Sequence, residues 1–138
     1  VNGNKALVLA AAMLAAGIIG GAGPAGSVPS ETLRPLLREA MPDLPAHTLT
    51  AVEVVFPPGA VSSPHWHGRA VLFASVLAGT VRSQIEGEPV RTYRTGDSWT
   101  EKPGDHHVLT ENGSATETAT LLVVFVAPTG DALKTDDP

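Results

Sequence analysis

From residue 47 onward, hydrophobic and polar positions alternate in short runs that are separated by glycine and proline. In TLTAVEVVF (48–56), Val52, Val54 and Phe56 fall on one side of an extended chain and Glu53 on the other, which predicts a strand with one buried face. Short strands between turns, with no helix among them, predict an all-β fold, an antiparallel sandwich or barrel. Similar runs follow at 65–79, 80–87, 90–97, 106–114 and 118–128, and the last of them is apolar on both faces, as expected of a central strand.

One short helix is predicted ahead of these strands, in SETLRPLLREAM (30–41). Ser30 can cap its first turn and Pro42 ends it. Pro35 falls within the first turns, where a missing N–H costs least. Three leucines of the segment share one helical face, which we expect to pack against the outside of the main domain. At the other end of the chain, the polar segment TGDALKTDDP (129–138) is expected to be loose.

Residues 1–26 have the pattern of a secretory signal peptide. Lys5 is the only charged residue among them, and the wholly apolar or glycine run Ala6–Gly21 is followed by small residues. The run is shorter than the roughly 20 residues that comfortably span a bilayer, and an uncleaved N-terminal anchor is the alternative interpretation. We therefore expect a secreted or periplasmic protein whose mature part, 27–138, is one domain with its core at 47–127.

Composition and charge narrow the function classes. The chain has no cysteine, which excludes thiolate metal ligands and a cysteine nucleophile. Its formal charge is -5, and loss of residues 1–26 would remove Lys5 and no acidic residue, which leaves -6. An acidic surface argues against nucleic acid and anionic membranes as partners, and a small molecule is the expected ligand. No Ser-His-Asp order, phosphate-binding loop or paired-carboxylate signature is present.

A pair of histidines, His65 and His67, is the first sign of a functional site. With a spacing of two on a strand, both side chains project from the same face, where two imidazoles can bind one cation. Two ordinary surface histidines beside Trp66 are the alternative that spacing alone leaves open. A second pair, His106 and His107, is adjacent in sequence, so its members should point to opposite faces, with His106 toward solvent.

Glycines and a Pro-Gly turn surround these histidines at regular intervals: Gly59 and Gly79 around His-Trp-His, and then Gly96, Pro103, Gly104 and His107. Together they resemble the two signature motifs of the cupin superfamily, in the same order and across residues 49–126. The resemblance implies a cupin-type jelly roll, an antiparallel barrel-like sandwich with an open mouth. It also implies that His65, His67 and His107 are ligands of a divalent metal ion.

The resemblance departs from the cupin pattern at one ligand. The glutamate of the first motif would fall at Leu72, or at Val71 with the shorter spacing, and neither side chain can bind a metal. In the second motif Lys102 replaces a proline, and Glu111 replaces an asparagine that recurs one step later as Asn112. We therefore expect a centre of three histidines without a carboxylate and with open coordination positions.

The ligand set does not choose among Fe, Mn, Cu, Ni and Zn. Within the cupin superfamily, three-histidine iron centres occur in some thiol and diketone dioxygenases. The resemblance thus implies a metal-dependent, dioxygenase-like oxidoreductase that acts on a small organic molecule. The alternative is a non-catalytic periplasmic module that binds a metal or a small ligand. A basic residue or a carboxylate within reach of the metal would favour catalysis, and a cavity lined only by apolar residues would favour the binding module.

Other side chains are candidates for the cavity. Gln84 could give an amide oxygen as a fourth ligand, because glutamine replaces the glutamate in some cupins, or it could lie on an exposed strand face. Tyr93, Trp66 and Trp99 suit either cavity walls or core packing. His47 is expected to be structural or exposed. Four arginines could bind an acidic substrate if their side chains turned inward: Arg69, Arg82, Arg91 and Arg94. Strand alternation predicts an outward, solvent-exposed face for Arg82, Arg91 and Arg94.

Exposed edge strands of small barrels are commonly covered by dimerisation, so a homodimer is predicted.

Overall fold

The computed structural model describes residues 26–138, and every regular element in this range is a β-strand. The predicted signal peptide, apart from Gly26, lies outside the described residues. No helix that is long and apolar enough to cross a membrane is found within that range. The strands are β1 (Thr32–Ala40), β2 (His47–Phe56), β3 (Val61–Ser62), β4 (His65–Trp66), β5 (Val71–Ala78), β6 (Thr80–Ile85), β7 (Arg91–Arg94), β8 (Ser98–Glu101), β9 (His106–Asn112), β10 (Ala119–Pro128) and β11 (Thr135–Asp136).

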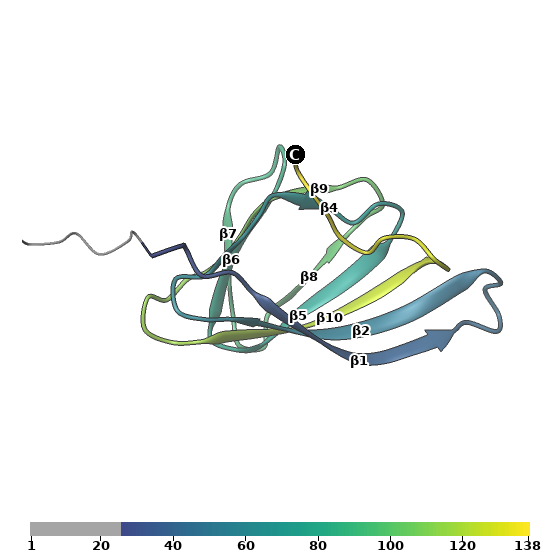
Figure 1. The fold of residues 1–138 in the computed structure, drawn as a ribbon, viewed down its shortest axis with the longest axis horizontal. Coiled ribbons are helices and arrows are strands. Elements are labelled where there is room, and N and C mark those ends of the chain that lie inside the picture. The colour runs from purple at the N-terminus through teal and green to yellow at the C-terminus, as the bar shows by residue number, and fades with distance from the viewer. Residues whose placement is uncertain (1–25) are drawn as a thin grey trace, which may run out of the picture.

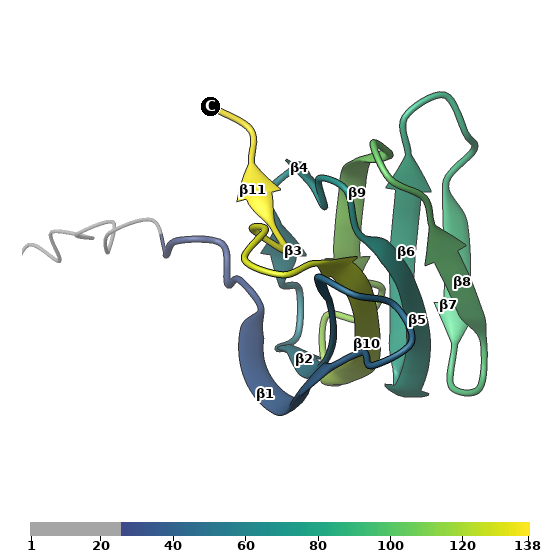
Figure 2. The same cartoon turned by 90° about the vertical axis from the view of Figure 1, so that its right-hand side faces the viewer.

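The strands form two antiparallel sheets that face each other (Figures 1 and 2). One sheet has the order β1-β2-β10-β5-β8, and the other has the order β11-β4-β9-β6-β7, with β3 also paired to β9. Neighbours in each sheet are mostly distant in sequence, as in a jelly roll, where the chain passes back and forth between the sheets. The predicted all-β jelly-roll architecture is confirmed.

The space between the sheets is filled by alternate side chains of the paired strands. β2 buries Val52, Val54 and Phe56, as its alternation predicts. β10 alternates buried and half-buried positions along its whole length and lies between β2 and β5, which confirms its predicted central position. Each fully buried aliphatic or aromatic side chain contributes roughly 1.5–3 kcal/mol relative to exposure. This packed apolar core fixes the relative positions of the strands that carry the functional side chains.

Residue 79 joins β5 to β6, and both its backbone conformation and its surroundings require glycine. Its φ is +78°, a conformation that side chains disfavour. A Cβ at this position would lie 2.7 Å from the carbonyl oxygen of Thr118 and 2.8 Å from the Cα of Ala119, which is too close for any side chain. The glycine therefore allows the β5–β6 turn to approach the start of β10.

The predicted N-terminal helix is wrong, because its residues form β1, an edge strand antiparallel to β2. Eight residue pairs join the two strands, with an irregularity between Pro35 and Leu37. Proline has no N–H to donate, which both an edge strand and a bulge tolerate. The leucine spacing suits a helical face, but a short isolated helix is marginal, whereas the free edge of β2 offers backbone partners along the whole segment.

The C-terminal segment, expected to be loose, is docked on the second sheet. Its strand β11 pairs with β4, and the backbone N–H of Asp137 donates to the carbonyl of Pro64 at 2.9 Å. The side chain of Asp137 also accepts a hydrogen bond from Trp66 Nε1 on β4, at 3.0 Å. As a result, Leu133 and Lys134 line the cavity between the sheets.

Candidate metal centre

Three histidines converge at one end of the space between the sheets. β4 and β9 pair so that His65 lies directly opposite His107, and His67 follows immediately after β4. All three are buried, with exposures of 5%, 9% and 3% for His65, His67 and His107. One ring nitrogen from each lies within 4.8 Å of the others, which is close enough for all three to bind one ion. The structure thus brings together the three predicted ligands, in a cluster able to hold a metal.

The ring orientations of two histidines are fixed by backbone carbonyls. Nδ1 of His65 lies 2.7 Å from the carbonyl of Ser63, and Nδ1 of His67 lies 2.6 Å from the carbonyl of Leu133. A carbonyl oxygen only accepts hydrogen bonds, so each Nδ1 carries the proton and each Nε2 presents a lone pair. The two Nε2 atoms face each other at 3.1 Å. Two facing lone pairs repel unless a cation lies between them, and this carbonyl support is typical of histidine ligands.

The third histidine is held by two hydroxyls. Nε2 of His107 lies 2.7 Å from Ser83 Oγ and 2.8 Å from Thr110 Oγ1. Its other nitrogen, Nδ1, is buried and has no hydrogen-bond partner. A buried polar atom without a partner is costly, and a bound ion is one arrangement that would satisfy it. The free nitrogens of the three rings are therefore suited to one shared cation.

A carboxylate that the sequence analysis missed lies beside the histidines. Glu101, at the end of β8, is only 2% exposed. Its Oε1 accepts a hydrogen bond from Trp99 Nε1 at 3.0 Å and lies 3.1 Å from His107 Nδ1, without the alignment of a hydrogen bond. Its Oε2 has no partner and lies 3.6 Å from His67 Nε2. The centre therefore contains three imidazoles and one carboxylate, and the expected absence of a carboxylate is corrected.

The position of Glu101 explains the departure from the cupin pattern. β5 pairs with β8 so that Leu72, which occupies the expected glutamate position, is the direct partner of Glu101. The carboxylate thus comes from the neighbouring strand instead of from β5. The alternation in SWTE (98–101), which puts Trp99 and Glu101 on one face, was the signal that could have revealed it. Without the strand pairing, Glu101 resembled one more acidic residue near a turn.

Burial sets the charge states of these groups. It lowers the pKa of His65 to about 4 and also lowers the pKa of His67. Both rings are therefore neutral near pH 7, the form that binds metals. Burial alone would raise the pKa of Glu101, but the neighbouring His107 and the Trp99 N–H more than offset this, and the pKa lies below its ordinary value. A charged carboxylate beside the neutral imidazoles of His65 and His67 suits a divalent cation.

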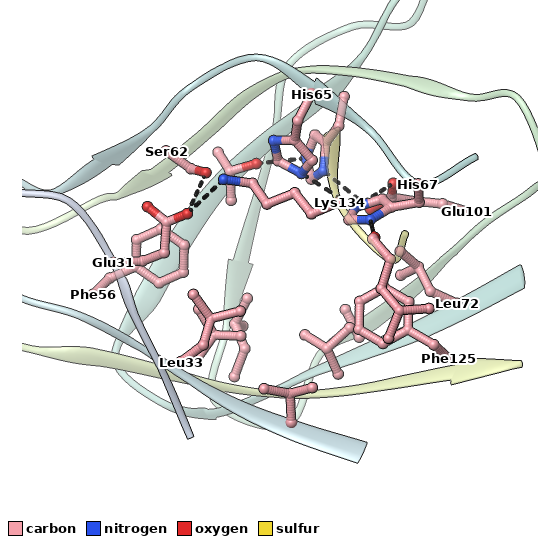
Figure 3. Close-up of a pocket in the computed structure, with 18 of the residues that line it drawn as sticks. Glu31, Leu33, Phe56, Ser62, His65, His67, Leu72, Glu101, Phe125 and Lys134 are labelled. Carbon is pink, nitrogen blue, oxygen red and sulfur yellow. Dashed lines mark hydrogen bonds and ion pairs between the residues drawn. The ribbon is translucent and has the colours of Figure 1, made fainter. Parts of the chain in front are cut away.

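A cavity of about 140 Å³ adjoins the centre (Figure 3). Aliphatic and aromatic side chains from all five strands of the first sheet form most of its wall. Leu72 and Phe125 lie beside the histidines, and Phe56 lies farther along. Trp99 also lines it and packs against Tyr93, with ring centroids 4.4 Å apart and the rings tilted by 32°. Three histidines, a carboxylate and an apolar pocket together permit binding and polarisation of a small ligand.

A polar group lies beside His65, on the side of the cavity away from Glu101. The Lys134 ammonium lies 2.9 Å from Glu31 Oε1 and 2.9 Å from Asp136 Oδ1, and Ser62 Oγ donates to Glu31 at 2.7 Å (Figure 3). Burial opposes ionisation of Glu31, but hydrogen bonds from Ser30, Ser62 and Lys134 lower its pKa to about 2. The positive charge of Lys134 is therefore already matched by the carboxylates of Glu31 and Asp136.

Other candidates lie outside this cavity. Gln84 Nε2 donates to the carbonyl of Glu88 at 2.8 Å and borders a second, polar cavity, so the structure does not bring it to the histidines. His106 turns away from His107, as predicted, but stacks on Trp66 at a centroid distance of 4.1 Å and contacts Asp137. His47 is bound to the carbonyl of Pro45. The four arginines do not line the cavity: Arg69, Arg82, Arg91 and Arg94.

Comparison with known proteins identifies relatives of this fold. A family model for a cupin domain matches residues 52–125, which is 74 of 138 residues and thus more than half of the chain. Among solved structures, an oxalate oxidase is 27% identical with a TM-score of 0.51, covering 56% of this chain and 41% of the oxidase. DMSP lyase DddQ from Ruegeria pomeroyi DSS-3 is 27% identical with a TM-score of 0.54, covering 61% of this chain and 41% of the lyase.

A third structure covers more of both chains. It is an uncharacterized conserved protein with a double-stranded beta-helix domain from Klebsiella pneumoniae subsp. pneumoniae MGH 78578, 18% identical, with a TM-score of 0.61 over 79% of this chain and 85% of that one. At this identity the similarity supports the fold alone. The chain spans less than half of the oxidase and the lyase. No curated protein sequence matches it.

Proposed function

The chain belongs to the cupin family, and we propose that it is a metal-dependent cupin enzyme that carries out an oxidative, dioxygenase-like reaction on a small organic molecule. The proposal takes His65, His67 and His107 as ligands and Glu101 as the fourth. The observation that carries it is the free Oε2 of Glu101, buried beside three histidines at the end of a cavity. A carboxylate in this place is the feature that favours catalysis over simple binding.

The residues present fit a divalent ion. Three neutral imidazoles and one carboxylate would leave such an ion with a net charge of about +1 and with open coordination positions. An ion bound there would polarise an oxygen-bearing ligand and, if redox-active, support its oxidation. The protein would hold His67 through the Leu133 carbonyl, His107 through Ser83 and Thr110, and Glu101 through Trp99. Such supporting contacts fix ligand geometry and tune affinity.

The apolar wall would perform a second task. A cavity walled by side chains such as Leu72 and Phe125 excludes water from the reacting atoms, which strengthens electrostatic interactions and suppresses side reactions. The metal identity stays open among Fe, Mn, Cu, Ni and Zn, because imidazole and carboxylate ligands suit all of them.

A non-catalytic binding module is the second candidate, and one observation favours it. Besides the histidines and Glu101, the ionisable side chains that line the cavity within residues 26–138 are Glu31 and Lys134, and these are paired with each other. Within residues 26–138, the cavity lining therefore offers no further unpaired acid or base for proton transfer to a ligand. Export to the periplasm or the medium, and a homodimer, remain predictions for either candidate.

One experiment tests the proposal and separates the two candidates. The full chain is loaded with Fe(II), Mn(II) or Cu(II), its metal content is measured, and dioxygen uptake is followed with a panel of small organic acids. We expect about one ion per chain and substrate-dependent uptake that Glu101→Gln reduces at least tenfold, since loss of a supporting or direct ligand costs about 10–100-fold. Stoichiometric metal binding with no uptake for any redox metal would instead assign the binding module.

A control guards against a general loss of structure. His47→Ala removes a ring whose Nδ1 lies 3.1 Å from the carbonyl of Pro45 and which does not line the cavity. It should bind metal as the parent does. If His47→Ala and His65→Ala lose metal equally, the ligand assignment is refuted.

A further inference from the structure

The size of the cavity bounds its ligand. Its volume of about 140 Å³ is close to that of an engineered apolar cavity of about 150 Å³ in another protein, which holds one benzene molecule. The part of a ligand that lies inside the cavity beside the histidines is therefore about the size of one six-membered ring. Fused rings and long chains would extend beyond this space toward solvent.

The wall of the cavity selects the chemistry of that body. Phe56, Leu72, Leu121 and Phe125 are buried side chains without a hydrogen-bonding atom, and all four line the cavity. A polar body would lose hydrogen bonds to water and find no replacement against this wall. An apolar ring or a branched alkyl group gains by leaving water. The wall therefore favours an apolar body over a hydroxylated one.

The two polar ends of the cavity differ in the charge they can accept. At the end away from Glu101, Lys134 is matched by Glu31 and Asp136, each at 2.9 Å. A second anionic group that reached this end would meet an ammonium already paired and the charge of Glu31. At the histidine end, a divalent ion with Glu101 keeps about one positive charge, which a single anionic group balances.

We propose that the ligand of this cavity is a small monoanion with an apolar body, such as an aromatic or branched-chain carboxylate of benzoate size. Its anionic group lies at the histidine–Glu101 centre, and its body lies against Leu72 and Phe125. The inference rests on the proposed metal-dependent function, because the anionic group needs the ion. The proposed ligand differs from oxalate, the substrate in the name of oxalate oxidase, which has two carboxylates and no apolar body.

The test measures binding instead of turnover. The full chain is loaded with Zn(II), its zinc content is determined, and benzoate, acetate, benzyl alcohol and terephthalate are titrated by calorimetry. Benzoate should bind roughly thirtyfold tighter than acetate, which lacks the ring. It should also bind at least about tenfold tighter than benzyl alcohol, which lacks the charge, and than terephthalate, which adds a second charge and greater length.

A pair of variants locates the ring in the cavity. Leu33 is about half exposed and lines the rim of the cavity from the edge strand β1, so Leu33→Trp places a larger side chain at the opening with little risk to folding. Leu37 lies on the same strand, is exposed and does not line the cavity, so Leu37→Trp is the matched control. We expect benzoate affinity to fall at least about tenfold in Leu33→Trp and to stay unchanged in Leu37→Trp, with zinc content equal in both.

The outcomes distinguish the two proposals. If the parent chain takes up none of zinc, iron, manganese or copper, the proposed metal-dependent function fails, and this inference fails with it. If zinc binds at one per chain but acetate or terephthalate binds as tightly as benzoate, the metal centre stands and the ligand class is overturned. Equal benzoate affinity in the two tryptophan variants overturns it as well.

Discussion

Glu101→Gln is the change that most sharply separates a metal ligand from a structural residue. Glutamine keeps the size of the side chain and the Oε1 that accepts from Trp99 Nε1. It replaces Oε2, which has no hydrogen-bond partner to lose. In the metal-free protein we expect the free energy of unfolding to fall by about 1–3 kcal/mol, because the amide loses the attraction of the ionised carboxylate to His107.

The same substitution should strongly weaken metal binding. Oε2 lies 3.6 Å from His67 Nε2, so an ion held by these histidines would lie within reach of the carboxylate. A unit charge pair at about 4 Å attracts with roughly 4 kcal/mol at an effective dielectric constant near 20, and loss of hydration offsets much of this. A net loss of about 1.4–3 kcal/mol corresponds to a roughly 10–100-fold weaker affinity.

Competition with a chromophoric zinc chelator measures the affinity, and urea unfolding of the metal-free chain measures stability. Glu111→Gln is the matched control, because Glu111 lies on the outer side and pairs with Arg82. It should change neither quantity by more than a surface ion pair is worth, about 0–1 kcal/mol. If Glu101→Gln binds zinc as tightly as the parent does, the carboxylate is not part of the centre.

Three further predictions follow from individual contacts. His65→Ala or His107→Ala should abolish metal retention after dialysis, whereas His106→Ala should keep it, and equal loss in all three variants would overturn the ligand assignment. Gly79→Ala should destabilise the fold by about 3 kcal/mol or more, because its Cβ would meet Thr118 O at 2.7 Å, whereas Gly87→Ala, also at positive φ but in open space, should cost about 1 kcal/mol. The depressed pKa of Glu31 stabilises the fold above the ordinary value of 4.5, and this contribution is lost as the pH falls toward about 2. Allowing for solvent screening, Glu31→Gln should remove about 1–2 kcal/mol of acid-dependent stability, and an unchanged pH profile between 6 and 2.5 would contradict the assignment.

Most strands between residues 47 and 128 and the histidine pair of the centre were predictable because their signals are local. Alternation in β2 depends only on which face is buried, and Val52, Val54 and Phe56 follow it. His65 and His67 share a face because their spacing is two. The resemblance to the cupin motifs then added His107, whose contact with His65 depends on the pairing of β4 and β9.

The features that escaped prediction depend on contacts between distant segments. Glu101 belongs to the centre because β8 pairs with β5, and its neighbours in sequence do not reveal this pairing. β1 is a strand because the edge of β2 was free, although its leucines suit a helix. The polar C-terminal segment supplies the carbonyl that orients His67 and the ammonium of Lys134, through contacts with Pro64 and Trp66 that composition cannot indicate.

Elemental analysis of the protein isolated from its own source, without added metal, tests the central claim most directly. The proposed function predicts close to one redox-active ion, iron, manganese or copper, per chain, and loss of that ion from His107→Ala prepared in the same way. Zinc alone would contradict the oxidative reaction. A protein that carries no metal as isolated and takes up none on reconstitution would contradict the metal centre itself.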